Sequence, residues 1–428
     1  MLTAIQSALG CVLLWRRSLV LALAGAAGSA ALSFVIFLNP SANWYALFLA
    51  ILLMVVLDRS PKAAAWRNLA VGAILAATFA MRQLSGVFLA IGAIAWLLGE
   101  RHDREEGNAW LARSLIAIML AGLLFYLLRL AHWPSVVLLG IGPVVLLAAA
   151  LRRASLGSGA TLRLLLQLAL GSLPVAAPLL AYHLINGTLG SWFDDAFVVA
   201  LSLPQLAFFT QQSFADLAAI ATLSLIHPES LRAAANGLFW LVLLFLPLAL
   251  GLGTLRRCRY GASQASWDAA PFVACCFAMV SAHFESPIYL AHSTAAVLLG
   301  WLWLRAAAPD ARPVRRWLAA GMVGFLATIS LAFQAAQPLE RNIAGIMRGL
   351  TLPLDAPQGI PGARIAMSGE DRDVYTQLMD FIDAHARACD TVLALPMHPQ
   401  INFLSRRRAP FRFFSSALGL RSDKDVAD

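Results

Sequence analysis

The chain has 428 residues, of which 60% are hydrophobic and 13% are charged, with a formal net charge of +9 and a mean hydropathy of +0.73. An average soluble domain carries roughly 25% charged residues. A soluble core cannot bury this much apolar surface, so the composition excludes a water-soluble globular protein and indicates a membrane protein. No basic stretch alternates with stacking aromatic residues, which argues against nucleic-acid binding and leaves anionic lipid headgroups as partners of the positive charge.

The basic residues of the first 337 positions cluster in alternate gaps between apolar stretches. Eighteen of them form six groups: Arg16 and Arg17; Arg59, Lys62 and Arg67; Arg101, Arg104 and Arg113; Arg152, Arg153 and Arg163; Arg256, Arg257 and Arg259; and Arg305, Arg312, Arg315 and Arg316. The intervening gaps contain only Arg82, Arg129 and Arg232. Loops on the cytoplasmic side collect Lys and Arg, so the six groups predict the cytoplasmic face of a bacterial inner-membrane protein.

Eleven apolar segments are predicted as membrane helices, because a hydrocarbon core of about 30 Å needs roughly 20 residues per crossing. They are Ser18–Leu38, Asn43–Leu57, Asn68–Met81, Leu84–Leu98, Ser114–Leu130, Pro134–Leu151, Leu162–Leu184, Gly237–Leu255, Ala269–Phe284, Pro287–Trp303 and Trp317–Gln334. The third and fourth are short for a full crossing and are joined only by Arg82-Gln83, so they predict a broken pair. The multi-spanning domain is thus 1–337, and the tail, 338–428, lies outside the cytoplasm.

The first apolar segment, Met1–Leu14, is too short to span and ends at Trp15-Arg16-Arg17 on the cytoplasmic side. Its charges follow the apolar run, whereas a signal peptide carries them before it. Two interpretations remain. The segment is either the cytoplasmic half of a helix whose beginning lies upstream, or a short helix that lies in the membrane interface.

Two further regions lie on the outer side. The loop 185–235 mixes aromatic and acidic residues, which predicts amphipathic helices in the interface. The tail predicts a small α/β unit, with strands at Ala363–Met367 and Val392–Leu395 and, between them, a helix capped by Ser368. The apolar stripe expected on that helix consists of Val374, Leu378, Phe381 and Ile382.

Polar groups at membrane depth are expensive, so each is a functional candidate. Arg82 lies between two short helices on the outer side, where an arginine can bind a phosphate; the alternative is a side chain that reaches lipid headgroups. His283, Glu285, Tyr289 and His292 lie on one outer turn and the helix after it. Tyr289 and His292 are three residues apart and can face one cleft, although internal hydrogen bonds between helices are an equal interpretation.

Asp194 and Asp195 are adjacent acids in the outer loop, where they are either solvated or available as a base or metal ligand. The five cysteines and eight histidines show no metal-binding spacing. The sequence therefore establishes no cofactor, and a divalent metal stays an alternative that no motif supports.

Four stretches taken together resemble the GT-C superfamily of membrane glycosyltransferases, in particular its glycosyltransferase family 39 and RgtA/B/C/D-like branch. The first runs from Gly72 through Met81-Arg82-Gln83 to Gly86, where the family has a basic residue and glutamine between two glycine-containing helices. The others are Gly171–Gly187 with Leu189, Trp192 and Phe193; Glu285–Leu299; and Tyr375–Pro410. The resemblance covers nearly the whole chain in order, although each motif alone is weak.

This resemblance implies transfer of a sugar from a polyprenyl-phosphate donor to a glycan, lipid or protein acceptor on the outer face. Arg82 and Gln83 would bind the donor phosphate, and His292, with Tyr289 and His283, would line the cleft. The family's catalytic carboxylate lies in its first outer loop, whereas Asn39-Pro40-Ser41-Ala42 contains no acid.

The catalytic base is therefore unknown, with Glu285, Asp194 and Asp195 as weak candidates, and the chain is expected to bind the donor without transferring it. This agrees with the interpretation that Met1 opens inside a helix. The alternatives are a non-catalytic relative that binds lipid-linked sugar, and a transporter or flippase, for which a second broken helix pair is missing.

Overall fold

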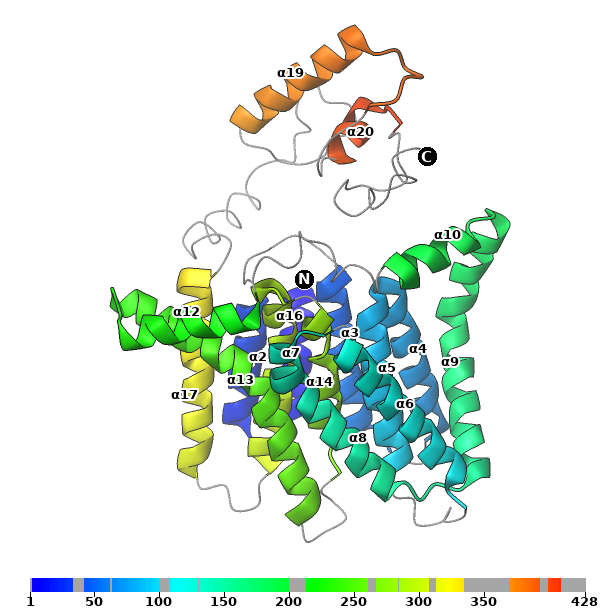
Figure 1. Cartoon of the computed structure of the whole chain (residues 1–428), viewed down its shortest axis with the longest axis vertical. Coiled ribbons are helices and arrows are strands. Elements are labelled where there is room, and N and C mark those ends of the chain that lie inside the picture. The colour runs from blue at the N-terminus through cyan, green and yellow to red at the C-terminus, as the bar shows by residue number, and fades with distance from the viewer. Residues whose placement is uncertain are drawn as a thin grey trace. The chain divides into compact units, whose positions relative to one another are not determined.

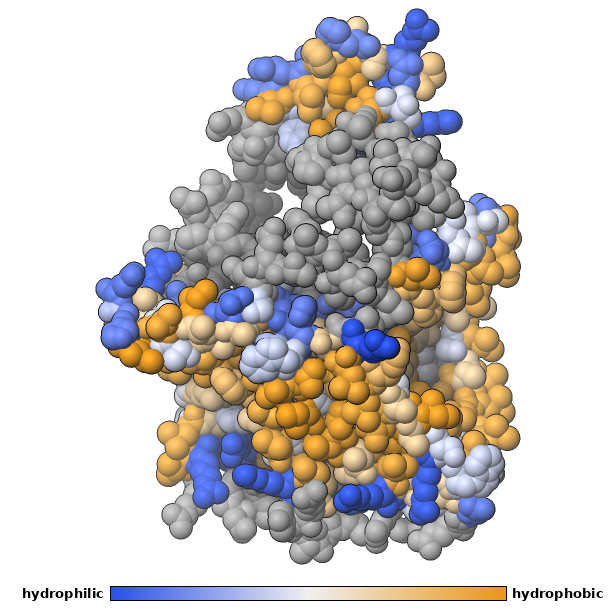
Figure 2. All heavy atoms as spheres, viewed as in Figure 1, coloured by the Kyte–Doolittle hydropathy of each residue, from blue (hydrophilic) through white to orange (hydrophobic). Residues whose placement is uncertain are grey.

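The computed structural model describes residues 2–33, 42–61, 64–100, 108–129, 131–199, 213–260, 267–283, 285–307, 313–334, 369–392 and 399–408. The chain divides into two compact units, Met1–Pro338 and Leu339–Asp428. The first unit is a bundle whose helices run side by side (Figure 1), and its middle is covered by apolar side chains, with hydrophilic residues near its lower edge (Figure 2).

Each of the eleven predicted segments contains a helix. These are α2 (Leu19–Leu32), α3 (Ala42–Arg59), α4 (Ala65–Met81), α5 (Gln83–Gly99), α6 (Trp110–Arg129), α7, η1 and α8 (Trp133–Ser135, Val136–Gly140, Ile141–Arg153), α9 (Ser158–Ile185), α13 (Leu231–Tyr260), α14 and α15 (Ala269–Phe277, Val280–His283), α16 (Pro287–Ala307) and α17 (Pro313–Ile329), which continues as η6 (Ser330–Gln334). Within the described ranges, seven helices are long and apolar enough to cross a membrane, while α2, α4, α5 and α14–α15 are shorter. The all-helical membrane class is therefore supported, and the count of eleven crossings stays a prediction.

The N-terminal segment forms α1 (Leu2–Trp15), which packs against α2, α3 and α16. Gln6, Gly10, Leu13 and Leu14 are buried in this packing. This packing favours the interpretation of α1 as part of a bundle helix, while the interfacial helix stays the alternative, because Val12 and Trp15 are exposed.

The loop 185–235, which is predicted to lie on the outer side, contains α10 (Leu189–Phe193), a π-helical turn η2 (Asp194–Val199) and α12 (Phe214–Ile226). α12 lies across the bundle helices near one end of the unit (Figure 1). Its N-terminus has a capping box, in which Ser213 and Asp216 bond to each other's backbone N–H groups, and Ile220, Leu223 and Ile226 are exposed. An apolar face on a helix in this orientation agrees with the predicted interfacial helix.

The second unit contains the predicted helix as α19 (Gly369–His385), followed by α20 (Pro399–Ser405). Among its described residues, the buried apolar side chains are Met379, Ile382 and Leu404, with Leu378 packed against them. Two members of the expected stripe, Val374 and Phe381, are instead exposed.

The predicted strands of this unit are not established. Thr391 forms an isolated parallel bridge with Arg408, but residues 393–395 and the predicted strand Ala363–Met367 lie outside the described residues. The α/β assignment of the tail therefore stays a prediction.

Small residues let α4 and α9 approach closely. A Cβ atom built on Gly72 would lie 2.1 Å from the carbonyl oxygen of Leu168, and one built on Gly171 would lie 2.0 Å from that of Leu69. The amide of Asn68 donates to the side chain of Gln167 at 2.7 Å beside this crossing. Membrane helices associate through such backbone contacts, because lipid supplies no hydrophobic drive between them.

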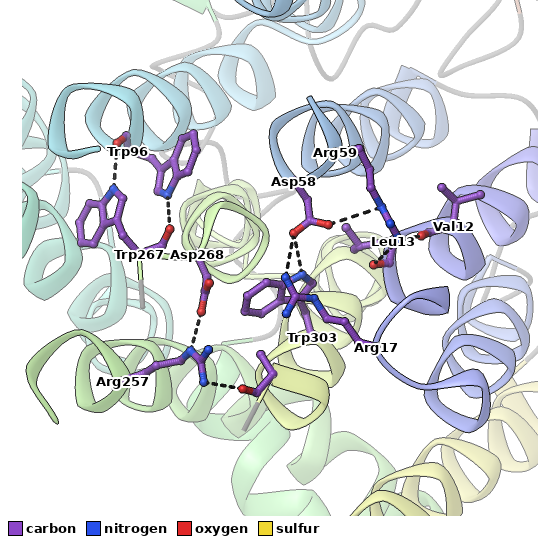
Figure 3. Close-up of polar contacts among 11 residues, drawn as sticks. Val12, Leu13, Arg17, Asp58, Arg59, Trp96, Arg257, Trp267, Asp268 and Trp303 are labelled. Carbon is purple, nitrogen blue, oxygen red and sulfur yellow. Dashed lines mark hydrogen bonds and ion pairs between the residues drawn. The ribbon is translucent and has the colours of Figure 1, made fainter. Parts of the chain in front are cut away.

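Ion pairs and tryptophan hydrogen bonds join the arginine-bearing helix ends (Figure 3). Asp58 at the end of α3 accepts from Arg17 at 3.4 Å and from the indole N–H of Trp303 at 3.1 Å. Arg257 donates to Asp268 at 2.5 Å and to the carbonyl of Ala307 at 2.9 Å. These bonds tie α2, α3, α13, α14 and α16 together at one end of the bundle.

Two other contacts extend this network to α4 and α5. Trp96 and Trp267 donate their indole N–H groups to each other's carbonyl oxygens, at 3.4 and 2.9 Å. Arg67 pairs with Glu100 at 2.8 Å, and both side chains are only 2% exposed. Removing one partner of such a pair leaves a buried charge without a counter-charge, which is strongly destabilising. The pair therefore fixes how α4 and α5 meet at this end of the bundle.

The α4–α9 contact predicts that Gly72→Ala destabilises the protein. The added methyl group meets backbone atoms of Leu168 that cannot rotate away, so we expect a loss of about 1–3 kcal/mol. Gly122→Ala on α6 is the matched control, because nothing lies within 4 Å of its Cβ position, and alanine is the better helix former. Thermal unfolding in detergent micelles compares the two, and equal unfolding temperatures would contradict the prediction.

Candidate functional site

α4 and α5 are joined by one non-helical residue, Arg82, whose φ of −155° and ψ of 106° are extended. Its N–H bonds to the carbonyl of Thr78 at 2.8 Å, and its carbonyl accepts from the N–H of Gly86 at 3.0 Å. A Cβ atom on Gly86 would lie 2.5 Å from the Cα of Phe79, so only glycine lets α5 fold back this closely. Each helix has 17 residues, or about 25 Å, which is less than the bilayer core.

The guanidinium group of Arg82 lies over the ring of Tyr289, with its central carbon 4.8 Å from the ring centroid. Tyr126 on α6 lies near enough to interact electrostatically with the same group. Among the described residues, no carboxylate forms an ion pair with Arg82. The positive charge at this turn is therefore matched only by aromatic faces.

His292 is the most unusual polar group of the site. Its side chain is 4% exposed, yet both ring nitrogens lack a hydrogen-bond partner in the part of the chain that the structure describes. Its ring packs edge to face against Trp44, with ring centroids 4.2 Å apart, and its centroid lies 6.2 Å from that of the Tyr289 ring. Buried polar atoms are nearly always bonded, so these nitrogens mark a place where a ligand atom or water would bind.

A buried glutamine holds Trp44 against His292. Gln6 on α1 donates to the carbonyl of Trp44 at 3.0 Å and accepts from the hydroxyl of Ser33 at 3.1 Å. Gln6 is 1% exposed, so breaking these bonds would leave an unpaired amide in an apolar core. The position of α3 next to the site thus depends on α1.

His283 joins the site through a second residue, Tyr126. Its Nδ1 lies 3.1 Å from the hydroxyl of Tyr126, and Phe88 on α5 packs edge to face on the tyrosine ring at 5.3 Å. His283 therefore orients Tyr126, which in turn flanks the arginine.

Two apolar cavities flank the Arg82 turn, and Val87 lines both. The smaller, about 280 Å³, lies between α5 and α6 below η2, and its lining includes Gln83, Leu84, Phe88, Tyr126 and Phe197. The larger, about 490 Å³, lies between α4, α5 and α9, and its lining includes Phe79, Gly86, Val175, Leu179 and Trp192. Arg82 itself lines neither cavity, but a cation at a turn beside apolar cavities is suited to an amphiphile with an anionic head.

The carboxylate of Glu285 is buried and fully engaged. One oxygen accepts from the hydroxyl and the N–H of Ser135, at 2.6 and 3.2 Å, and the other accepts from the N–H of Phe214 at 3.0 Å. These donors belong to the first turns of α7 and α12, where N–H groups lack helical partners. Glu285 therefore anchors α12 to the bundle, and its oxygens are occupied by bonds that a general base would have to release.

Asp194 and Asp195 lie nearer to the arginine turn than their place in the chain suggests. They begin η2, and the next two residues, Ala196 and Phe197, line the smaller cavity. The ring of Phe197 also packs against Phe79, in the last turn of α4, at 5.7 Å. The fold therefore brings these two acids to the border of the cavity that Gln83 lines.

The structure thus gathers Arg82, Tyr289 and His292 directly, reaches His283 through Tyr126, and puts Gln83 at the cavity wall. Sequence reasoning missed Trp44, Tyr126, Gln6 and Phe197. Aromatic residues in apolar segments carry no signal that separates a site from a core. The buried Gln6 was the one visible clue, because an amide inside an apolar run requires a partner.

The fold and site define a helical membrane protein with a cationic, aromatic-lined turn beside apolar cavities. Comparison with protein-family models, with curated proteins and with solved structures finds no match. Among the described residues, no three His, Cys, Asp or Glu side chains gather closely enough to hold a metal ion.

The contacts of Glu285 predict that Glu285→Ala destabilises the protein. The change leaves the N–H groups of Ser135 and Phe214 without a buried acceptor, at about 1–3 kcal/mol per unsatisfied group. Thermal unfolding measures the loss, and faster proteolysis near residues 200–212 would report release of α12. Glu229→Ala, at an exposed position, is the control. An unchanged unfolding temperature for Glu285→Ala would show that the carboxylate does not anchor α12.

Proposed function

We propose that this protein is an integral membrane glycosyltransferase that uses a polyprenyl-phosphate-linked sugar on the outer face of the membrane. The observation that carries the proposal is Arg82, a cation with no carboxylate partner among the described residues, at a turn whose neighbouring residues line two apolar cavities. The sugar and the transfer reaction come from the GT-C resemblance of the stretch from Gly72 to Gly86.

The chemistry of the site favours a lipid phosphate over other ligands. A guanidinium group binds phosphate oxygens with two parallel hydrogen bonds. The electrostatic attraction between the two groups is strongest where little water is present. The two cavities of about 280 and 490 Å³ are lined almost entirely by apolar side chains, which suit a hydrocarbon chain. An ordinary soluble anion would use the charge but leave both cavities without an occupant.

The buried nitrogens of His292 supply hydrogen-bonding groups beside the arginine. A neutral imidazole has one donor and one acceptor, so it can bind a hydroxyl group or a phosphate oxygen that enters from the Arg82 side. Trp44 and Tyr289 hold the ring from two sides, which fixes its orientation. This arrangement supports a polar headgroup near Arg82.

A non-catalytic protein that binds lipid-linked sugar is the second candidate, favoured by the occupied carboxylate of Glu285. A transporter or flippase ranks third, because the described helices contain one pair joined by a single extended residue, α4 and α5, and transporters usually repeat such elements.

The proposal predicts that Arg82→Ala weakens binding of polyprenyl phosphate by about 10–150-fold, the equivalent of about 1.5–3 kcal/mol for hydrogen bonds to a charged group. Arg82→Lys should retain part of the affinity, since the charge remains while the paired geometry is lost. Binding is measured on purified protein in lipid nanodiscs. Arg129→Ala, an exposed arginine at the end of α6, is the control. Equal affinity for wild type and Arg82→Ala would reduce Arg82 to a headgroup anchor.

The position of η2 gives a separate prediction about transfer. The absence of an acid from residues 39–42 predicts that the chain binds the donor without transferring it. Where the chain does transfer sugar, we expect the reaction to depend on Asp194 or Asp195, so that Asp194→Asn or Asp195→Asn lowers the rate by about 10²–10⁴-fold and leaves donor binding unchanged. Turnover of a labelled lipid-linked sugar by the purified chain is the measurement. A wild-type chain that binds the donor but transfers nothing would favour the non-catalytic candidate, and loss of transfer in Glu285→Gln alone would identify Glu285 as the base.

A further inference from the structure

The N-terminus of α5 lies at the same turn as Arg82. Gln83, Leu84 and Ser85 form the first turn of this helix, and no side chain caps it. The first N–H groups of any helix lack a partner within the helix, and the aligned peptide dipoles give that end a partial positive charge of about half a unit. Such an end is a ready site for an anion, provided that something else shows a ligand is expected.

Two observations show that a ligand is expected. The hydroxyl of Ser85, in the first turn, is fully buried and has no partner among the described residues. The cavity of about 280 Å³ begins at this turn, because Gln83 and Leu84 line it. A buried hydroxyl without a partner costs free energy unless another group bonds to it.

We propose that the first turn of α5 is the second half of the phosphate site. The N–H groups of Gln83 and Leu84 and the hydroxyl of Ser85 bind the non-bridging phosphate oxygens, while Arg82 supplies the full positive charge. The ligand class is a phosphate ester carried on an apolar chain. This inference rests on the proposed function, because it adds backbone donors to the same phosphate that Arg82 binds.

The charges of the site match this ligand. Arg82 contributes one positive charge and the helix end about half of one, against the one to two negative charges of a phosphate ester. Both contributions act in surroundings lined by apolar side chains, where they are screened less than in water.

Proline at position 83 tests the backbone donors directly. Proline has no N–H group and is well tolerated at the first position of a helix. It requires an extended residue before it, and Arg82 is already extended, with φ −155° and ψ 106°. Gln83→Pro therefore removes one N–H group and the side chain, whereas Gln83→Ala removes the side chain alone, so the difference between them reports the N–H group.

We expect Gln83→Pro to bind polyprenyl phosphate about tenfold more weakly than Gln83→Ala in lipid nanodiscs. The control is Ala65→Pro, the same change at the first position of α4, where the preceding Ala64 is also extended; it should bind like wild type. Polyprenol, which lacks the phosphate, should bind equally to the proline and alanine variants. Inorganic phosphate, added at the same concentration as polyprenyl phosphate, should not displace polyprenyl phosphate from the protein.

The outcomes separate this inference from the proposed function. If Gln83→Pro binds polyprenyl phosphate as Gln83→Ala does, while Arg82→Ala loses affinity, the helix N-terminus is not part of the site and the proposed function stands. If Arg82→Ala also binds like wild type, both ideas fail. The inference would be overturned if Gln83→Pro weakened the binding of polyprenol as much as that of polyprenyl phosphate, or if inorganic phosphate displaced polyprenyl phosphate. Either result would show that the site does not recognise a phosphate carried on a lipid.

Ser85→Ala keeps the test valid if Gln83→Pro does not fold. Ser85 is in the first turn and is not needed to cap the helix, and alanine fits the space of the hydroxyl. We expect about threefold weaker binding of polyprenyl phosphate and unchanged binding of polyprenol. Wild-type affinity of Ser85→Ala for the phosphate would then refute the proposal.

Discussion

The close contact between the last turn of α4 and the first turn of α5 is the constraint on which the site depends. Gly86 faces the backbone of Phe79 without room for a side chain, so the two helices reverse direction through Arg82 alone. Because each helix is too short to cross the bilayer core, the reversal lies among other helices. Tyr289, Tyr126 and the two cavities surround it there.

The polar groups of the bundle follow one rule, which is that each requires a partner from within the protein. At the arginine-bearing end each of three carboxylates has a partner: Asp58, Asp268 and Glu100 each pair with an arginine. Some nitrogens of Arg59 and Arg67 nevertheless have no hydrogen-bond partner among the described residues. At the Arg82 end both ring nitrogens of His292 and the hydroxyl of Ser85 are buried without a partner in the described part of the chain. This end differs from the other because its cation, Arg82, has no carboxylate partner among the described residues.

The helices and the Arg82 turn could be predicted from the sequence because their signals are local. Apolar length marks a membrane helix, and an arginine between two short apolar runs is conspicuous. The contacts that complete the site are not local: Trp44 reaches His292 from α3, and Glu285 bonds to residues on α7 and α12. No periodicity encodes such pairs. The expected stripe on α19 failed similarly at Val374 and Phe381, because the position of α20 decides which face is covered.

Three helix N-termini of the bundle differ in the charge that lies against their first N–H groups. The first turns of α7 and α12 share the carboxylate of Glu285, which supplies a negative charge and accepts their N–H groups. The first turn of α5 receives no side-chain cap and stands beside a second positive charge, Arg82. A helix N-terminus that is buried away from water is stabilised by a nearby anion and destabilised by a nearby cation. One carboxylate, that of Glu285, supplies this anion to both α7 and α12, and the phosphate proposed at α5 would supply it there.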